Sequence, residues 1–270
     1  MPSRLGQNFL ASPAWRRRVL DAIAARAGDR IVEIGGGRGE LSIGLAAAGA
    51  ALLIVELDPG LAAELRRRFA SCPRVAVRQA DVRELDLAAA LDALDGPGPG
   101  RRLVVGNLPY YISSPILAHL CRYSSALDEA VVMLQKEVAG RVASPPGHRA
   151  YGLLSAWVQA HALPEPLFDL PPGAFRPAPK VSSTLLRLRF APQLRAWGID
   201  DAGFLLFLRA AFAGKRKRLW NNLKPRYGLP RLQAAWRLET LSSDLRAEAL
   251  APAALASLYR RLEADRSGGA

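Results

Sequence analysis

The segment Arg30-Ile31-Val32-Glu33-Ile34-Gly35-Gly36-Gly37-Arg38-Gly39 places an apolar run directly before a glycine-rich turn, and residues 40–48 continue with helical spacing. This order predicts a buried strand, a tight turn and a helix, which together are typical of an open α/β sheet. Glycines let a backbone approach a ligand closely, and the helix start adds free N–H groups. The segment therefore predicts a nucleotide-like ligand at the end of this strand.

The turn is not typical of a dinucleotide site. The dinucleotide fingerprint requires a third glycine at position 40, where this chain has Glu40, and a carboxylate repels a pyrophosphate. An acidic residue there favours a ligand with cationic groups and no phosphates, and S-adenosyl-L-methionine is such a ligand. Glu33 lies inside the strand, so we expect it to hydrogen-bond loop amides or a cofactor ammonium rather than to act as a base.

Two further strand ends carry acidic residues. Glu56 follows the apolar run 51–55, and Asp81 follows the run 74–78 after two intervening residues. Because ligands of open α/β sheets bind at the carboxyl ends of the strands, Glu56 is expected to accept both hydroxyls of a ribose, and Asp81 the amino group of an adenine. For Asp58 and Asp81 taken singly, a helix N-cap or a solvated loop charge is the alternative. Their joint occurrence favours a cofactor site.

A second informative segment, Val105-Gly106-Asn107-Leu108-Pro109-Tyr110-Tyr111-Ile112-Ser113, ends another apolar run. An exocyclic amine on a planar base is a poor nucleophile because its lone pair is delocalised, so a methylating site must hold its N–H groups with acceptors. The Asn107 side-chain oxygen and the Leu108 carbonyl are suitable acceptors. Pro109 would fix the backbone, and Tyr110 offers a flat face for a flipped-out base. Taken alone, the segment could equally be a turn that ends a strand.

Together these motifs resemble the ribosomal RNA adenine N6,N6-dimethyltransferases. The resemblance covers nearly the whole chain. The motifs occur in family order as Leu5-Gly6-Gln7-Asn8-Phe9-Leu10, the glycine turn, Glu56-Leu57-Asp58, Ala80-Asp81-Val82, Asn107-Leu108-Pro109-Tyr110, Leu134-Gln135-Lys136-Glu137-Val138 and Phe175-Arg176-Pro177-Ala178-Pro179-Lys180-Val181. The chain departs from the family at Gly36, where relatives usually have proline, and we expect this glycine to loosen the turn. It also has Arg149 where relatives more often have lysine.

The resemblance implies an enzyme that dimethylates two adjacent adenosines near the 3′ end of small-subunit (16S) ribosomal RNA during ribosome biogenesis, with S-adenosyl-L-methionine as cofactor. Asn107, Leu108, Pro109 and Tyr110 would hold the target adenine, and Phe175 would lie opposite Tyr110 across the base. The implied cofactor contacts are Asn8, Leu10, Gly35, Gly37, Glu56, Asp81, Val82 and Asn107. The expected reaction is an in-line displacement, in which the protein supplies alignment and electrostatics without a metal or a covalent intermediate.

Net charge gives independent evidence for a nucleic-acid partner. The chain has 37 Lys and Arg against 24 Asp and Glu, a formal charge of +13. Residues 202–238 contain nine basic residues and no acidic residue, so this region binds phosphates without reading sequence if it is a contact surface. The alternative is a solvated helix face in an arginine-rich protein. We expect RNA contacts from a basic helix that contains Lys215, Arg216, Lys217, Arg218 and Asn222.

The order of apolar patterns predicts the architecture. Strand and helix patterns alternate up to about residue 190, which indicates an α/β, doubly wound, Rossmann-like class I methyltransferase sheet. Prolines make residues 163–179 irregular by expectation. Beyond residue 192 the pattern is wholly helical. We therefore expect a methyltransferase domain at 1–191 and a small helical RNA-binding domain at 192–270.

Composition also excludes several classes. No apolar run reaches the length of a membrane helix and the first residues lack a signal-peptide pattern, so we expect a cytoplasmic location without a membrane partner. Cys72 and Cys121 form no disulfide or zinc pattern, and the histidines have no ligand spacing. The expected form is a monomer that binds the 30S particle without a metal.

Three other functions remain open at this point. The nearest is a sister enzyme that methylates an adenosine of large-subunit RNA. The second is an assembly factor that binds immature small subunits and whose catalysis is incidental. The third is a nicotinamide dehydrogenase on a similar sheet, against which Glu40 argues.

Overall fold

The computed structural model describes residues 7–95 and 98–264. The chain divides into two compact units, the first made of residues 1–139 and 163–191 and the second of residues 140–162 and 192–270. One observed boundary therefore coincides with the expected boundary after residue 191. Residues 140–162, which were expected in the first domain, group with the helical unit. Leu5 and Gly6 of the first family motif lie outside the described residues.

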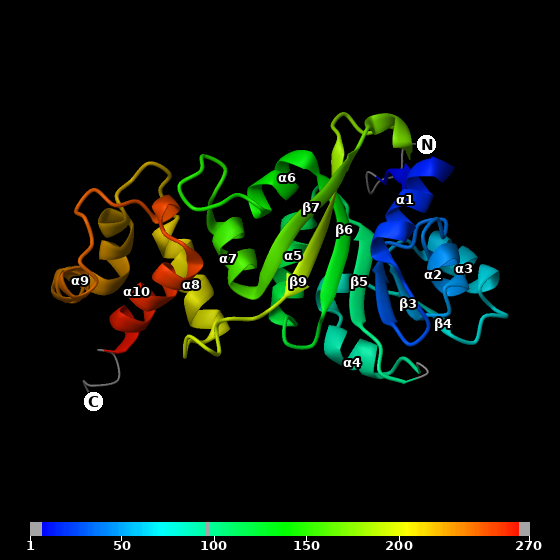
Figure 1. The fold of residues 1–270 in the computed structure, drawn as a ribbon, viewed down its shortest axis with the longest axis horizontal. Helices are drawn as coiled ribbons and strands as arrows, with labels where there is room; N and C mark the ends of the chain where they lie inside the picture. The colour runs from blue at the N-terminus through cyan, green and yellow to red at the C-terminus, as the bar shows by residue number, and fades with distance from the viewer. Residues whose placement is uncertain (1–6, 96–97, 265–270) are drawn as a thin grey trace. The chain divides into compact units, whose positions relative to one another are not determined.

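The first unit is built on a sheet that has seven strands among the described residues, in the order β4-β3-β2-β5-β6-β9-β7 (Figure 1). The strands are β2 (Arg30–Ile34), β3 (Ala51–Glu56), β4 (Val75–Gln79), β5 (Arg102–Asn107), β6 (Glu129–Gln135), β7 (Ala162–Leu170) and β9 (Ser183–Phe190). Strands β2 to β6 pair in parallel, and β9 pairs antiparallel with β6. This topology confirms the predicted doubly wound α/β fold. A separate small sheet pairs β1 (Phe9–Leu10) with β8 (Phe175–Arg176).

Local sequence explains where the helices of this unit begin. The helices that flank the sheet are α1 (Pro13–Ile23), α2 (Ser42–Ala47), α3 (Pro59–Arg68), α4 (Leu87–Asp92) and α5 (Ser113–Arg122). Asp58 caps α3, because its side chain accepts a hydrogen bond from the Leu61 N–H at 2.9 Å, and Pro59 occupies the first helical turn. The N-cap alternative for Asp58 is therefore the correct one.

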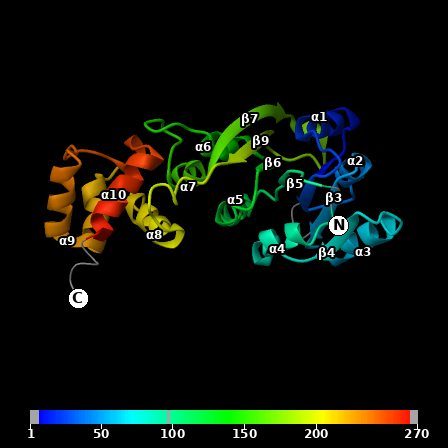
Figure 2. The same ribbon diagram turned by 60° about the horizontal axis from the view of Figure 1, so that its bottom comes forward.

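The expectation of irregular structure at residues 163–179 is wrong for its first half. Residues 162–170 form strand β7, which lies at the edge of the sheet beside β9 (Figures 1 and 2). Pro164 and Pro166 are two residues apart, so their backbone nitrogens face the same side of the strand. At an edge this side can point away from the neighbouring strand, where no ladder hydrogen bond is lost. Prolines are therefore compatible with a strand at the edge of a sheet and do not exclude one.

The strand order reverses between β2 and β5, since the chain passes outward from β2 through β3 to β4 and then returns to β5. Such a reversal leaves a crevice at the carboxyl ends of the two central strands. Strands β2 and β3 are almost entirely buried, as expected for strands covered on both faces. A Cβ added to Gly106 would lie 2.4 Å from the Ile34 carbonyl oxygen, so glycine permits this close approach just before Asn107.

The second unit is helical within the described residues. Its helices are α7 (Leu153–His161), α8 (Asp201–Ala211), α9 (Leu219–Leu238) and α10 (Pro252–Ala264), and α6 (Lys136–Val142) contains the unit boundary. Helix α7 packs against α8 and α10, which explains why residues 140–162 belong here. Phe204, Phe207 and Tyr259 form an aromatic core with ring centroids 5.6 to 6.1 Å apart. In the described part of the chain, no helix has the length and apolarity needed to cross a membrane.

Asp29 joins the start of β2 to the start of β5. Its buried carboxylate accepts hydrogen bonds from Arg101 Nη2 at 2.6 Å and from the Arg101 and Arg26 backbone N–H groups. Burial raises the pKa of this carboxyl, but the hydrogen bonds from Arg101 and Arg26 together outweigh burial and hold the pKa below its usual range. The ion pair therefore stabilises the folded chain above the unfolded pKa.

We expect Asp29→Asn to lower the free energy of unfolding by about 2–4 kcal/mol at pH 7, because Arg101 loses its buried partner while remaining partly solvated. The contribution of Asp29 is complete above an unfolded pKa of about 3.9 and is lost as pH falls through the lower folded pKa. Urea unfolding at pH 7 and at acidic pH measures both effects. Asp92→Asn, which removes the exposed partner of Arg102, is the matched control and should change stability by less than about 1 kcal/mol. Equal effects of the two substitutions would contradict the assignment.

Candidate active site

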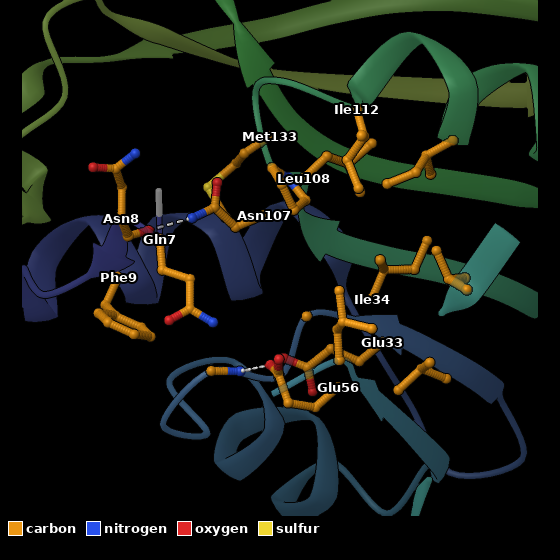
Figure 3. A pocket seen from close by; sticks show the side chains of 18 of the residues that line it. Gln7, Asn8, Phe9, Glu33, Ile34, Glu56, Asn107, Leu108, Ile112 and Met133 are labelled. Carbon is orange, nitrogen blue, oxygen red and sulfur yellow. Dashed lines mark hydrogen bonds between the residues drawn. The ribbon is translucent and has the colours of Figure 1, made fainter. Parts of the chain in front are cut away.

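A cavity of about 1000 Å³, open to solvent, lies at the carboxyl ends of β2, β3 and β5 (Figure 3). This is the position that the reversal of strand order predicts. The predicted residues that line it are Asn8, Leu10, Gly35, Gly37, Glu56, Asp81, Val82, Asn107, Leu108, Pro109 and Tyr110. Segments far apart in the sequence therefore meet here, and every expected cofactor contact is among them.

The glycine turn forms one wall of the cavity. Gly35 and Gly37 have φ values of 71° and 56°, in the left-handed region that favours glycine. At Gly36 an added Cβ would lie 2.3 Å from Ile54 Cγ2 and 3.0 Å from Leu65 Cδ1. A proline at this position would also bring a Cβ, so it would require Ile54 to repack. The middle glycine is therefore matched to the bulk of Ile54 beneath it.

Glu56 organises the same turn. One carboxylate oxygen accepts the Gly37 N–H and the other accepts the Asp58 N–H, each at 2.9 Å. Figure 3 shows this side chain directed at the turn. The Arg38 N–H in turn donates to Glu40 Oε2 at 3.0 Å. Of the two partners expected for Glu33, the structure shows no loop amide, since Glu56 and Glu40 accept these N–H groups, and a cofactor ammonium stays a prediction.

Glu33 is buried beneath the turn and faces the cavity. Ser42 Oγ donates a hydrogen bond to Glu33 Oε2 at 2.5 Å. Burial raises the pKa of Glu33 to about 8, and the nearby charges of Glu40 and Glu56 act in the same direction against the Ser42 hydrogen bond. Glu33 is thus largely protonated at neutral pH, which lowers the negative charge of this wall.

Asp81 lies at the third strand end, where its side chain also accepts the Arg83 backbone N–H. The Arg83 guanidinium forms a bidentate ion pair with the carboxylate, with Nη2–Oδ2 at 2.5 Å and Nε–Oδ1 at 3.0 Å. These hydrogen bonds lower the pKa of Asp81. Asp81 is therefore a charged acceptor at the cavity wall, although sequence reasoning did not identify Arg83 as its partner.

Asn107 is the central polar residue of the opposite wall. Its Nδ2 donates to the Asn8 carbonyl at 2.7 Å, which ties β5 to the segment before β1 (Figure 3). Its Oδ1 is buried and has no hydrogen-bond partner among the described residues. An unpaired buried acceptor lowers the stability of the folded chain by about 1–3 kcal/mol. A ligand that supplied an N–H donor to this oxygen would remove that penalty.

Tyr110 is held by a residue that the sequence analysis missed. Its hydroxyl forms a 2.6 Å hydrogen bond with the Oγ of Ser183, which is fully buried on β9. Burial raises the pKa of Tyr110, and the Ser183 hydrogen bond offsets part of that effect. Ser183 comes two residues after the Phe175–Val181 motif, and that proximity was the only signal available in the sequence.

Phe175 does not reach the cavity. It pairs with Leu10 in the β1–β8 sheet and is fully buried in the hydrophobic core, whereas the next residue, Arg176, is exposed. The structure therefore does not present Phe175 at the cavity, and its expected place opposite Tyr110 across a base stays a prediction. The strand register decides the outcome, since adjacent side chains of a strand point to opposite faces.

The predicted basic helix is a turn. Residues 215–218 precede α9, all four side chains are exposed, and Arg216 has a φ of 68°. Asn222 Nδ2 donates to the carbonyls of Ala211 and Gly214 at 2.8 and 3.2 Å. The amide of Asn222 therefore closes this turn, and its N–H donors are not directed at a partner molecule. The four cations form an exposed cluster, termed here the basic turn.

No cluster of three or more metal-ligating side chains occurs in the ranges 7–95 and 98–264. The polar side chains that line the cavity are instead carboxylates, the amides of Gln7, Asn8 and Asn107, and the hydroxyls of Tyr110 and Tyr111. They suit an organic ligand with hydroxyl, amino and cationic groups.

The raised pKa of Glu33 predicts a dependence of stability on pH. Because the folded chain keeps this proton up to about pH 8 and the unfolded chain releases it near pH 4.3, the contribution of Glu33 is complete below the unfolded pKa. It is lost as pH rises through the folded pKa. We expect Glu33→Gln, which cannot ionise, to raise the melting temperature relative to the wild-type protein at pH 8 more than at pH 4.

Thermal unfolding followed by circular dichroism at pH 4, 6 and 8 measures this difference. Glu64→Gln, an exposed substitution on α3, is the matched control and should leave the pH profile unchanged. A melting-temperature difference for Glu33→Gln that is the same at every pH would refute the assignment.

Comparison with known proteins places this geometry in a family. The profile of the family described as ribosomal RNA adenine dimethylase matches residues 2–263. Two curated relatives are each named ribosomal RNA small subunit methyltransferase A. The protein of Koribacter versatilis is 42% identical over 96% of this chain and 94% of its own length. The protein of Acidobacterium capsulatum is 46% identical over 98% of this chain and 92% of its own length.

Solved structures support the fold. A dimethyladenosine transferase from Plasmodium falciparum has a TM-score of 0.75 at 21% identity and covers 96% of this chain and 98% of its own. The 23S rRNA methyltransferase ErmE has a TM-score of 0.67 at 24% identity, and the match covers 95% of this chain and 100% of ErmE. At these identities the likeness concerns the fold alone, whereas the profile and the curated relatives extend along nearly the whole sequence. The chain belongs to the ribosomal RNA adenine dimethylase family, as its motifs predicted.

Proposed function

We propose that this protein transfers methyl groups from S-adenosyl-L-methionine to the N6 atoms of two adjacent adenosines near the 3′ end of small-subunit ribosomal RNA, during ribosome biogenesis. The observation that carries the proposal is the Oδ1 of Asn107, a buried acceptor without a hydrogen-bond partner among the described residues, on a residue that lines the cavity. An adenine amino group supplies the N–H donor that this oxygen lacks.

The residues of the cavity fit the cofactor. Glu56 would accept the ribose hydroxyls with the lone pairs that the turn leaves free, and Asp81 would accept the amino group of the cofactor adenine, with Val82 beside it. Gly35, Gly37, Asn8 and Leu10 would contact the remainder through backbone and apolar groups. When bound, S-adenosyl-L-methionine supplies a methyl group on a sulfonium, which is already an activated donor.

The residues opposite the glycine turn would hold the target base. Asn107 Oδ1 and the Leu108 carbonyl accept the two N–H groups, which favours a pyramidal nitrogen with its lone pair free to attack. Tyr110, fixed by Ser183, offers its ring for stacking. The protein thereby contributes position and electrostatics to an in-line displacement.

The second unit would supply binding to RNA. The basic turn presents Lys215, Arg216, Lys217 and Arg218 together, and residues 202–238 contain no acid to neutralise them. Such a surface contacts phosphates and fixes the position of the RNA, while the cavity reads the target base. In this proposal a monomer acts on the 30S particle in the cytoplasm.

Small-subunit RNA is favoured over large-subunit RNA by the curated relatives, which carry the small-subunit name at 42% and 46% identity. The likeness to ErmE, at 24% identity, concerns the fold and does not extend to the substrate. A dinucleotide-dependent dehydrogenase is disfavoured because Glu40 lies in the cavity wall, where it would face a pyrophosphate.

Transfer of labelled methyl from S-adenosyl-L-methionine to small subunits that lack the modification tests the proposal, beside large-subunit RNA and free adenosine. We expect labelled dimethyladenosine in the small subunit alone. Asn107→Ala should reduce the rate at least about 100-fold, because the acceptor for the amine is lost, and should leave RNA binding largely intact.

Label in large-subunit RNA would indicate the sister activity, and binding to small subunits without any transfer would indicate an assembly factor. Full activity of Asn107→Ala would contradict the role of its oxygen.

Replacing Lys215, Arg216, Lys217 and Arg218 together by alanine should weaken RNA binding and flatten its salt dependence. Each lost phosphate contact reduces the slope of log K against log salt by about 0.7–0.9. The control replaces four exposed arginines of α3 and β4 and its flanks, Arg66, Arg67, Arg74 and Arg78, with the same change of charge. Filter binding at several salt concentrations measures the slopes, and an unchanged slope for the basic-turn variant would rule out that surface.

A further inference from the structure

Tyr111 has no role in the proposed reaction. It lines the mouth, and 60% of its surface is exposed. Among the exposed large apolar side chains of the described residues it is the one aromatic. An aromatic ring kept in water at the mouth of a ligand cavity has a flat face available for a binding partner.

The turn that carries Tyr111 is fixed by its neighbours. The Ile112 N–H donates to the Pro109 carbonyl at 3.1 Å, and the Tyr110 hydroxyl is bound to Ser183. Leu108 and Ile112 both line the cavity (Figure 3). Tyr111 is therefore held at the rim by a preorganised turn while the residues on either side face inward.

Arg83 provides a cation at the same cavity. Its guanidinium is bound to Asp81, which lines the cavity together with Tyr111. Asp81 engages Nε and Nη2 of Arg83. The remaining N–H donors of the guanidinium have no partner among the described residues, and 44% of the side-chain surface is exposed. Asp81 thus orients Arg83 and leaves several donors open.

A flat ring and a fixed cation at one cavity match one nucleotide of a single strand, since bases stack on aromatic rings and phosphates bind guanidinium groups. When the target base enters the cavity past Tyr110, the adjacent nucleotide of the RNA stays at the rim, where Tyr111 lies. We infer that Tyr111 and Arg83 form a second nucleotide subsite, in which Tyr111 stacks on the base adjacent to the target adenosine and Arg83 binds the phosphate between them. The inference rests on the proposed function, because it takes RNA as the substrate.

The chemistry also limits what this subsite recognises. Stacking is tolerant of sequence because every base has a π-face, so Tyr111 requires the presence of a neighbouring base rather than a particular one. Glu84, the next residue along the chain, is acidic and exposed. The subsite therefore accommodates one phosphate at Arg83 and is not a continuous basic track.

The test compares three hairpin RNAs whose loops carry the two adjacent adenosines, either intact or with one adenosine replaced in turn by an abasic nucleotide. Affinity for the full-length protein is measured by fluorescence anisotropy with S-adenosylhomocysteine present, so that no transfer occurs. Tyr111→Ala should bind the intact RNA about 5-fold to 100-fold more weakly than the wild-type protein. With at least one abasic RNA, the two proteins should bind equally.

Two control variants separate stacking from other effects. Tyr111→Trp keeps an aromatic face and should retain the affinity of the wild-type protein. Leu163→Ala truncates an equally exposed side chain on β7 that does not line the cavity, and should bind all three RNAs normally. Arg83→Ala should reduce the slope of log K against log salt by the amount expected for the loss of about one phosphate contact.

If Tyr111→Ala weakened the affinity for all three RNAs by the same factor, or for none of them, the stacking role would be overturned. An unchanged salt slope for Arg83→Ala would overturn the phosphate contact. The proposed function fails separately, because it requires methyl transfer by the wild-type protein, whereas this comparison measures binding of an unreactive complex.

Discussion

The reversal of strand order between β2 and β5 is the constraint on which the site depends. Because the chain leaves these neighbouring strands in opposite directions along the sheet, no connection covers the gap between their carboxyl ends. The glycine turn and the Asn107 segment face each other across that gap. The hydrogen bond from Asn107 to the Asn8 carbonyl then joins the β1 segment to the same cavity.

Hydrogen bonding divides the cavity into two kinds of wall. On the side of the glycine turn, Glu56 and Glu33 are held by backbone N–H groups and by Ser42, and the Glu33 proton reduces the accumulated negative charge. On the opposite side, the oxygen of Asn107 is buried without a partner. A satisfied wall positions a ligand, whereas an unsatisfied acceptor gains free energy only when a donor arrives. The asymmetry matches a cofactor on one side and an amine on the other.

Binding of RNA would involve contacts of different kinds. The basic turn of the second unit offers exposed cations for phosphates, and the rim of the cavity offers Tyr111 with the cation of Arg83. Phosphate contacts fix the position of a nucleic acid without reading it, while the pocket selects the base that enters. In the proposed function the exposed cations would supply affinity without reading sequence, and the cavity and its rim would add contacts to the bases that they hold.

The sequence by itself determined the α/β fold, the ends of most strands and many of the residues that line the cavity, because apolar periodicity and glycine turns are local properties of the chain. Tertiary structure decided what depends on pairing between distant segments. The β1–β8 register buries Phe175 instead of presenting it at the cavity, the edge position of β7 accommodates prolines in a strand, and Asn222 closes the turn before α9. Likewise, Ser183 reaches Tyr110 and Arg83 covers Asp81 only in the folded chain. A side chain's direction follows from its neighbours in space, and a pattern along one segment does not contain them.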